Sequence, residues 1–301
     1  MEISEATLDD VPAAARMLSL TEPDRVMTPA GMLHFVSTVP ARARRRLWKA
    51  EVDGVLVAWA AAGLNWESDT EGGAYAGLTV HPDHRSRGIG TALWTLIEER
   101  LDEIGAERVS VMGADEPRSH AFAAARGFSE TYRLRFSRLD LGQLPPPPPV
   151  PADVELRPFT AFADDPRPIW AIDSEASRDI PLDQPIGEVL YEDWLARYWQ
   201  MPMVDFEASL VALVDGEPAS FTIVGVDPAT RRLESGMTGT LRRFRGRGLA
   251  ELVKRHSLTR AHASGIELAF TENDETNRAM LTVNERIGYR PTSARVTFSR
   301  P

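Results

Sequence analysis

The sequence predicts two α/β domains in tandem, on the evidence of a proline run and an internal repeat. The chain has 301 residues, which is too long for one ordinary hydrophobic core. Residues 145–149 are consecutive prolines, which cannot continue a helix or the middle of a sheet because they lack the amide proton and fix φ. We therefore expect a first domain over residues 1–140, a semi-rigid linker over 141–153 and a second domain over 154–301.

Each predicted domain contains an Asp-Gly pair between two runs of apolar, β-prone residues. Asp53-Gly54 lies between LWKAEV and VLVAWAAA, and Asp215-Gly216 lies between SLVALV and EPASFTIVG. Such a pair is the strongest short-range signal for a β-hairpin, because the turn favours positive φ. The sequence thus predicts two hairpins that are 162 positions apart.

A glycine-rich turn follows each hairpin and precedes a long amphipathic helix. The turns, RSRGIG at 85–90 and RGRGLA at 245–250, are 160 positions apart. Further along, the pairs Gly127-Phe128 and Gly288-Tyr289 are 161 positions apart. Nearly constant offsets across three unrelated features indicate an internal duplication.

The composition excludes several classes of function. A net charge of -10 argues against nucleic-acid binding, because backbone phosphates are held by clustered Lys and Arg. The absence of cysteine excludes disulfides, thiolate-zinc sites and a cysteine nucleophile, and we expect no metal site. The acidic start lacks the basic region of a secretory signal, and no stretch approaches about 20 uncharged apolar residues. We therefore expect a cytoplasmic protein with no membrane partner.

Each glycine turn joins the end of a strand to the start of a helix, which is an anion-binding geometry. The free N–H groups and the positive end of the helix dipole point into the turn, and glycine lets a phosphate approach the backbone. A helix cap with close packing is the alternative interpretation of each turn. A dinucleotide fingerprint is disfavoured, because no acidic strand end follows about 20 residues on.

The first turn belongs to the pattern V-x-P-x-x-R-x-x-G-I-G, which resembles the pyrophosphate loop of the GNAT superfamily of N-acetyltransferases. The second half repeats the pattern with alanine in the last place, so the resemblance covers nearly the whole chain. It implies a mixed sheet in each half, flanked by helices and splayed between residues 74–80 and 107–113, and between 233–240 and 266–271. It also implies acetyl-CoA as cosubstrate, held by Leu78, Val80, Arg85, Arg87, Gly88, Ile89, Gly90 and Thr91 and, in the second half, by Thr238, Thr240, Arg245, Gly246, Arg247, Gly248, Leu249, Ala250 and Asn277.

Catalytic groups differ between the halves. Transfer to an amine needs a group that accepts the ammonium proton and a group that protonates or stabilises the leaving thiolate. Glu234 lies eleven residues before Arg245, the offset of a catalytic Glu in tandem members of the mycothiol synthase type, and the first half has Ala74 at the matching sequence position. The alternative for Glu234 is an exposed strand residue beside two arginines.

The general acid is less well defined. Where the family commonly carries a Tyr, the second half has Asn284, so Tyr289, Tyr191 or a water is the candidate acid, unless the thiolate leaves without help. Asn284 is a candidate for catalysis or substrate binding, and helix capping or packing is the alternative. The aromatic segment that contains Tyr191 and Trp194 follows a helical spacing, and these two residues are candidates for acceptor contacts; core packing is the alternative.

The sequence therefore predicts an acetyl-CoA-dependent N-acetyltransferase that acts on a primary amine of a small molecule, with the chemistry in the second half. A protein or peptide N-acetyltransferase and a non-catalytic acyl-CoA-binding protein are the alternatives. We expect a monomer or a homodimer.

Overall fold

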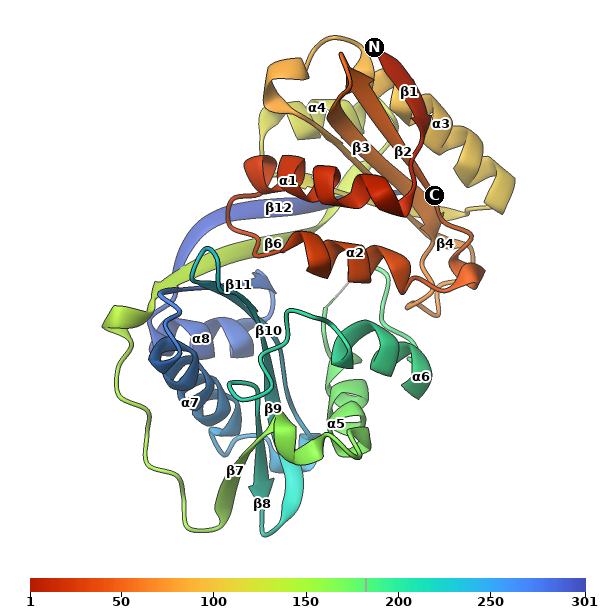
Figure 1. The fold of residues 1–301 in the computed structure, drawn as a ribbon. Coiled ribbons are helices and arrows are strands. Elements are labelled where there is room, and N and C mark those ends of the chain that lie inside the picture. Colours follow the sequence, from red (N-terminus) through yellow and green to blue (C-terminus); the bar gives the residue numbers. More distant parts are fainter. Residues whose placement is uncertain (182) are drawn as a thin grey trace. The chain divides into compact units, whose positions relative to one another are not determined.

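The computed structural model describes residues 1–181 and 183–301, and their contacts divide them into two compact units (Figure 1). The first unit consists of residues 1–133, 183–188 and 294–301. The second consists of residues 134–181 and 189–293. Each unit thus includes part of the other half of the sequence. The division into domains over 1–140 and 154–301, with a linker over 141–153, stays a prediction.

The sheet of the first unit is mixed, in the order β1-β2-β3-β4-β5-β12. Only β4 and β5 run parallel among these pairs. The strands are β1 (Glu2–Glu5), β2 (Arg46–Val52), β3 (Val55–Leu64), β4 (Gly73–Val80), β5 (Arg108–Ala114) and β12 (Arg290–Arg300). One face carries helices α1 (Val11–Thr21) and α2 (Pro29–Ser37), and the other carries α3 (Ile89–Ile104) and α4 (Pro117–Ala124).

The second unit repeats this arrangement in the order β7-β8-β9-β10-β11-β6. Its strands are β7 (Val154–Pro158), β8 (Leu210–Val214), β9 (Glu217–Asp227), β10 (Arg232–Thr240), β11 (Leu268–Asp274) and β6 (Ser129–Asp140). One face carries α5 (Arg167–Ser177) and α6 (Tyr191–Trp194), which continues as a π-helical turn over Leu195–Trp199. The other face carries α7 (Leu249–Ala263) and α8 (Arg278–Ile287).

The two sequence halves exchange their last strands. β6, from the first half, pairs through residues 134–140 with β11. β12, from the second half, pairs through residues 295–300 with β5. Each sheet is therefore completed by a strand of the other half.

Both predicted hairpins are confirmed. Asp53 and Gly54 have φ values of 51° and 77°, and Asp215 and Gly216 have 49° and 84°. Positive φ at both central residues gives the tight turn that matches the twist of the flanking strands. The turns set the register of β2 with β3 and of β8 with β9.

The proline run forms neither helix nor strand, as its missing amide protons require. The Pro148 carbonyl accepts a hydrogen bond from His256 Nε2 on α7 at 2.9 Å. The linker therefore lies along α7 within the second unit.

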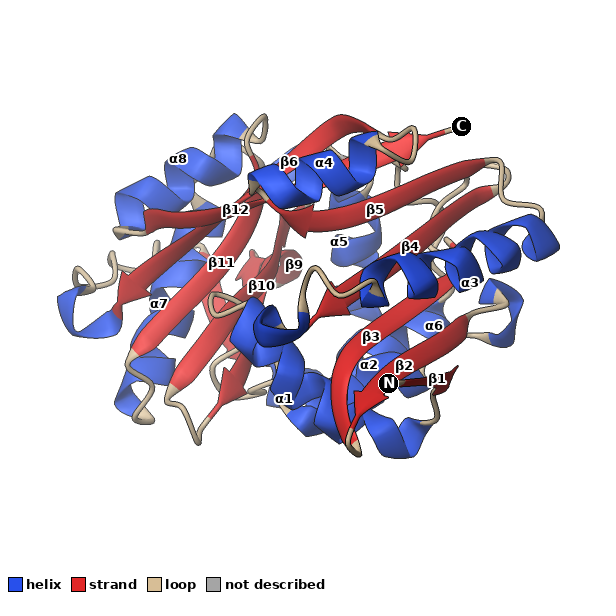
Figure 2. Ribbon diagram, turned by 90° about the horizontal axis from the view of Figure 1, so that it is seen from above, coloured by secondary structure: helices blue, strands red, loops and turns tan. Residues whose placement is uncertain are grey.

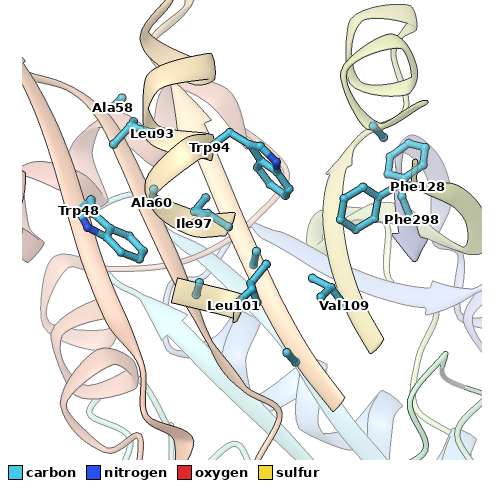
Figure 3. Packing of buried hydrophobic residues seen from close by; sticks show 14 of the residues in the cluster. Trp48, Ala58, Ala60, Leu93, Trp94, Ile97, Leu101, Val109, Phe128 and Phe298 are labelled. Carbon is cyan, nitrogen blue, oxygen red and sulfur yellow. The ribbon is translucent and has the colours of Figure 1, made fainter. Parts of the chain in front are cut away.

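Helix α3 supplies the larger core of the first unit. It lies against β3 and β4 (Figure 2), and its face toward the sheet repeats at helical spacing through Leu93, Trp94, Ile97 and Leu101. Figure 3 shows these side chains over Ala58 and Ala60 of β3. Small residues on β3 let the helix approach the sheet, and this contact fixes where the glycine turn before α3 begins.

Candidate functional site

Each unit has a splay between its two parallel strands. β4 pairs with β5 from Gly73↔Arg108 to Ala76↔Val111, and the pairing stops there although β4 continues to Val80. β10 pairs with β11 only from Arg232 to Glu234 and continues to Thr240. The later part of each strand thus has one edge that the neighbouring parallel strand does not use, so the predicted splays are confirmed.

A β-bulge distinguishes the two splays. β10 shifts register against β9 between Ser235 and Thr238, whereas β4 pairs with β3 without interruption. Gly236 and Met237 therefore face one residue of β9, and a bulge leaves its extra residue outside the ladder. Main-chain N–H groups that leave a ladder can stabilise charge on a carbonyl oxygen.

The bulge also changes which residue of the first half corresponds to Glu234. Glu234 lies opposite Gly225 of β9, and Tyr75 lies opposite Gly63 of β3 at the corresponding place. The first-unit counterpart of Glu234 is therefore Tyr75 and not Ala74. The sequence offset misled because the bulge adds one residue between this position and the glycine turn.

The two glycine turns share their geometry. Gly88 and Gly248 precede the helices with φ values of 81° and 77°. Arg85 Nε donates to the Val80 carbonyl at 3.1 Å, and Arg245 Nε donates to the Thr240 carbonyl at the same distance. The first-turn N–H groups of α3 and α7 have no intrahelical acceptor, so each turn can hold an anion.

Alanine in place of the last glycine is compatible with this turn. A Cβ at Gly90 would lie 3.7 Å from the side chains of Leu78 and Phe122, which is ordinary contact. Ala250 therefore does not by itself prevent the second turn from binding an anion.

The charges around the turns differ. In the first turn, Arg85 pairs with Glu116 at 3.8 Å, and Arg87 forms no ion pair within the described residues. In the second turn, Arg245 pairs with Asp179 at 2.6 Å and Arg247 pairs with Asp153. Asp179 also accepts from Arg242, and these two arginines lower the pKa of Asp179 to about 2.

Glu234 is half-buried on the face of β10 toward α5 and α6. Beside it, the guanidinium of Arg232 lies over the Phe270 ring at 4.1 Å from the centroid. Thr238 and Thr240 turn their hydroxyls to Thr222 and Ser220 of β9, each at 2.8 Å. The side chains of these threonines are thus held by β9, and binding of a ligand by their main chain stays a prediction.

The polar residues predicted on and after α8 are buried or used in capping. Asn277 caps α8 by accepting from the Met280 N–H at 3.2 Å. Asn284 is buried and donates to Asn273 Oδ1 of β11 at 2.5 Å, while its own Oδ1 has no partner among the described residues. Tyr289 is 1% exposed, and burial raises the pKa of its phenol.

The predicted acceptor residues lie in an aromatic layer over the second sheet. Trp194 is buried, donates from Nε1 to Asp173 at 2.7 Å and stacks on Trp199 at 5.9 Å between centroids. Tyr191 is half-buried, and the Arg167 guanidinium lies 4.6 Å from its ring centroid. This geometry gives Trp194 a packing role and leaves Tyr191 the more accessible of the two; their contact with an acceptor stays a prediction.

Residues 183–188, which we call the strap, belong to the first unit although they follow α5 in the chain. Gln184 is buried, and its amide donates to the Ala74 carbonyl at 3.0 Å and to Ser110 Oγ at 2.9 Å. Its Oε1 accepts from Asn65 Nδ2 at 2.9 Å. A Cβ at Gly73 would lie 2.6 Å from this oxygen, so glycine makes room for the strap.

In the first unit, the strap occupies the position that side chains beside Glu234 line in the second unit. By register, Gly73 and Ser110 correspond to Arg232 and Phe270. Gly73, Ser110 and the strap in the first unit therefore stand where the Arg232 guanidinium and the Phe270 ring lie beside Glu234 in the second unit. No local sequence signal predicts this contact, because its partners are distant along the chain.

Lys254 is the functional candidate that the sequence reasoning missed. It is 1% exposed on α7, and burial lowers the pKa of its amine to about 7. It is the sixth residue of α7, as Trp94 is of α3. Aligning the two halves at their glycine turns would have revealed a lysine at a core position.

Within the described part of the chain, no helix is long and apolar enough to cross a membrane. The same residues include no cluster of His, Asp or Glu that could hold a metal ion.

Comparison with known proteins agrees with this geometry. The model of the acetyltransferase (GNAT) family matches residues 17–128. The chain is 29% identical over 257 residues to a mycothiol acetyltransferase of Salinispora arenicola, covering 82% of this chain and 79% of that one. It is 32% identical over 215 residues to a mycothiol acetyltransferase of Frankia alni, covering 67% and 63%.

Two solved structures extend over nearly the whole chain. A tandem GNAT protein from the clavulanic acid biosynthesis pathway has a TM-score of 0.74 at 22% identity and covers 99% of this chain and 98% of its own. A GCN5-related N-acetyltransferase from Sphaerobacter thermophilus has a TM-score of 0.73 at 20% identity and covers 99% and 95%. The predicted duplicated α/β fold is therefore confirmed.

Proposed function

Because the chain belongs to the GNAT superfamily of N-acetyltransferases, we propose that its second unit transfers the acetyl group of acetyl-CoA to a primary amine of a small molecule. The observation that carries the proposal is Glu234 at the vertex of a splay with a β-bulge immediately after it. The first unit has an uninterrupted strand and Tyr75 at that place.

Glu234 acts as the base. An amine attacks a thioester only when neutral, so a carboxylate at the vertex accepts the ammonium proton directly or through a water. The side chain is half-buried, so a substrate can reach it. Main-chain N–H groups of the bulge stabilise the charge that develops on the thioester oxygen.

Acetyl-CoA fits both glycine turns. The free N–H groups at the starts of α3 and α7 would hold its pyrophosphate, with Arg87 and the Arg245 and Arg247 pair nearby. The unused edges of β4 and β10 would bond the pantetheine arm through main-chain groups near Val80 and Thr240. We assign binding to both units and transfer to the second.

A small acceptor is favoured over a protein by the named relatives, mycothiol acetyltransferases that match over most of the chain. The aromatic layer with Tyr191 would provide one wall of the acceptor site, and a primary amine would approach Glu234 from the α5 and α6 face.

The test is thiol release from acetyl-CoA with a panel of primary amines, namely amino sugars, amino acid amides and a lysine-containing peptide. We expect turnover with at least one small amine and at least tenfold lower kcat/KM with the peptide. Calorimetry with acetyl-CoA should show two sites on the intact chain. Preference for the peptide would overturn the acceptor class, and absence of acetyl-CoA binding would overturn the proposed function.

A further inference from the structure

An arginine lies beside the proposed base on the same face of β10. Arg232 and Glu234 are two residues apart in the strand, so their side chains point to one face and their Cα atoms are about 6.6 Å apart. Arg232 is half-buried, and its guanidinium lies over the ring of Phe270, which is 3% exposed. A cation at this place repels the ammonium form of a simple amine, so the proposed transfer alone does not account for it.

A second arginine lies on the other side of the same ring. Strands β10, β11 and β6 lie side by side (Figure 2), and Phe270 pairs with Glu234 on β10 and with Arg138 on β6. Paired residues share a face, so Arg138 lies on the face of Glu234, about 10 Å away across two strand spacings. Arg138 is exposed and forms no ion pair within the part of the chain that the structure describes. The base therefore shares its face of the sheet with one buried ring and two arginines.

In the first unit, a carboxylate of the chain itself lies at the corresponding place. Asp183 of the strap accepts hydrogen bonds from Ser110 Oγ at 2.7 Å, from Arg108 Nη2 at 2.8 Å and from Ser299 Oγ. Its side chain is 7% exposed. Burial alone would raise the pKa of Asp183, but the hydrogen bonds from the two serines and the arginine hold that pKa below its usual value. The first unit thus binds a buried carboxylate beside the vertex of its splay.

The second unit has arginines around the same position. By register, the serine of β5 corresponds to Phe270 and the serine of β12 corresponds to Arg138. Two residues earlier on the parallel strands, each unit carries one arginine, Arg108 on β5 in the first and Arg232 on β10 in the second. The strap supplies the carboxylate in the first unit, and a ligand can supply it in the second.

We propose that the acceptor carries a carboxylate in addition to its primary amine, and that Arg232, assisted by Arg138, binds this carboxylate while Glu234 receives the amine. The inference rests on the proposed function and names its substrate class, a small amino acid with a free carboxylate.

The charges of such an acceptor match the site. A zwitterion presents its ammonium to Glu234 and its carboxylate to Arg232, whereas an amine without the carboxylate leaves the arginine uncompensated. An arginine has five N–H donors in a planar fork, so Arg232 can contact the Phe270 ring and bind a carboxylate as well. Arg232 is thus a specificity-determining residue.

The first experiment measures acceptor binding without turnover. The intact chain is saturated with CoA, which has no acetyl group to transfer, and ligand-observed NMR follows alanine, β-alanine and γ-aminobutyrate, each beside its own amide. We expect at least one of the acids to bind roughly tenfold more tightly than its amide, because the amide lacks the charge that Arg232 pairs with. Absence of binding by all three acids, or equal binding of acid and amide in every pair, would overturn the proposal.

The second experiment repeats this binding measurement with variants. Arg232→Gln removes the charge and should weaken binding of the preferred acid roughly tenfold, with binding of its amide changed by less than about twofold. Arg138→Gln should weaken binding of the acid only about threefold, because Arg138 is exposed. Arg157→Gln, which alters an exposed arginine on the edge strand β7 of the same sheet, is the control and should change neither ligand. A merely structural role of Arg232 would weaken acid and amide alike, and that result contradicts the proposal.

Thiol release from acetyl-CoA separates this inference from the proposed function. Wild type should show roughly tenfold higher kcat/KM for the preferred acid than for its amide. A carboxylate raises the pKa of a nearby ammonium, so the acid has less neutral amine than the amide, and its preference cannot come from amine reactivity. Selective binding of the acid without any turnover would support the carboxylate site and reject the proposed transfer. Turnover with equal kcat/KM for acid and amide would keep the transfer and overturn the carboxylate site.

Discussion

The two units share one fold and differ where chemistry would occur. Both have a splay, a glycine turn with a left-handed residue before the helix, and the same arginine-to-carbonyl hydrogen bond. Only the second has the bulge, Glu234 and the buried Lys254. In the first unit the strap lies on the corresponding face. The backbone frame around the glycine turn is thus common to both units, and the proposed base belongs to one.

The largest effect should come from the base. Glu234→Gln keeps the shape of the side chain and removes its basicity, so kcat should fall by roughly 10²- to 10⁴-fold with acetyl-CoA affinity unchanged. Tyr75→Phe, at the matching place in the first unit, is the control and should leave kcat within twofold. Thiol-release kinetics measures both, and an equal loss in the two variants would remove the distinction between the units.

The glycine turns provide a test of binding in each unit. Valine at Gly248 or Gly88 must adopt a φ near 80°, which is strained for a β-branched residue, and its side chain would occupy the turn. Gly248→Val should weaken acetyl-CoA binding at one site by roughly 10- to 100-fold and abolish turnover.

Gly88→Val is the matched variant. It should remove the other calorimetric site and leave turnover in place. If Gly88→Val abolishes turnover while Gly248→Val does not, the roles of the two units are reversed.

Lys254 should also affect stability in a pH-dependent way. Its pKa is about 7 when folded and near 10.5 when unfolded, so the unfolded chain binds more protons between these values and stability rises with pH across them. Lys254→Met removes this penalty. The free energy of unfolding at pH 7 should rise by about 3–5 kcal/mol, and the gain should shrink toward pH 10.5. Denaturant unfolding at several pH values measures this gain. A gain that does not change with pH would mean that folding does not lower the pKa of Lys254.

Sequence reasoning reached the features that short segments determine. The Asp-Gly turns, the glycine turns and the splays all follow from local backbone preferences or from a resemblance in sequence. The counterpart of Glu234 was assigned one residue away because a bulge leaves no mark in composition. The exchange of β6 and β12 was not foreseen, since either strand fits the edge of either sheet.

The contact of the strap with the first sheet could not be predicted from the sequence, for a related reason. Gln184 bonds to groups more than 70 positions away, and an isolated glutamine in a loop carries no sign of such partners. Its amide makes three hydrogen bonds in a buried site, and Gln184→Ala would leave the Ala74 carbonyl and Asn65 short of a partner.

Gln184→Ala should therefore destabilise the first unit by about 2–3 kcal/mol. Gln143→Ala, which removes an exposed side chain with one 3.3 Å contact, is the control and should change stability by less than about 0.5 kcal/mol. Thermal unfolding measures both, and kcat should be unaffected. A loss of kcat in the Gln184 variant at a temperature where it is folded would mean that the strap also serves the transfer reaction.

The smallest expected effect concerns the charge around the second glycine turn. Asp179 holds Arg242 and Arg245, so an incoming pyrophosphate competes with a carboxylate for the same cations. Asp179→Asn keeps the shape and removes the charge, and acetyl-CoA should bind the second unit about three- to tenfold more tightly at low salt, with a smaller gain at high salt because these groups are partly exposed. Asp165→Asn, which removes an exposed partner of Arg167 at the start of α5, is the control and should not change affinity. Weaker binding in the Asp179 variant would show that the carboxylate positions the arginines for the ligand and does not compete with it.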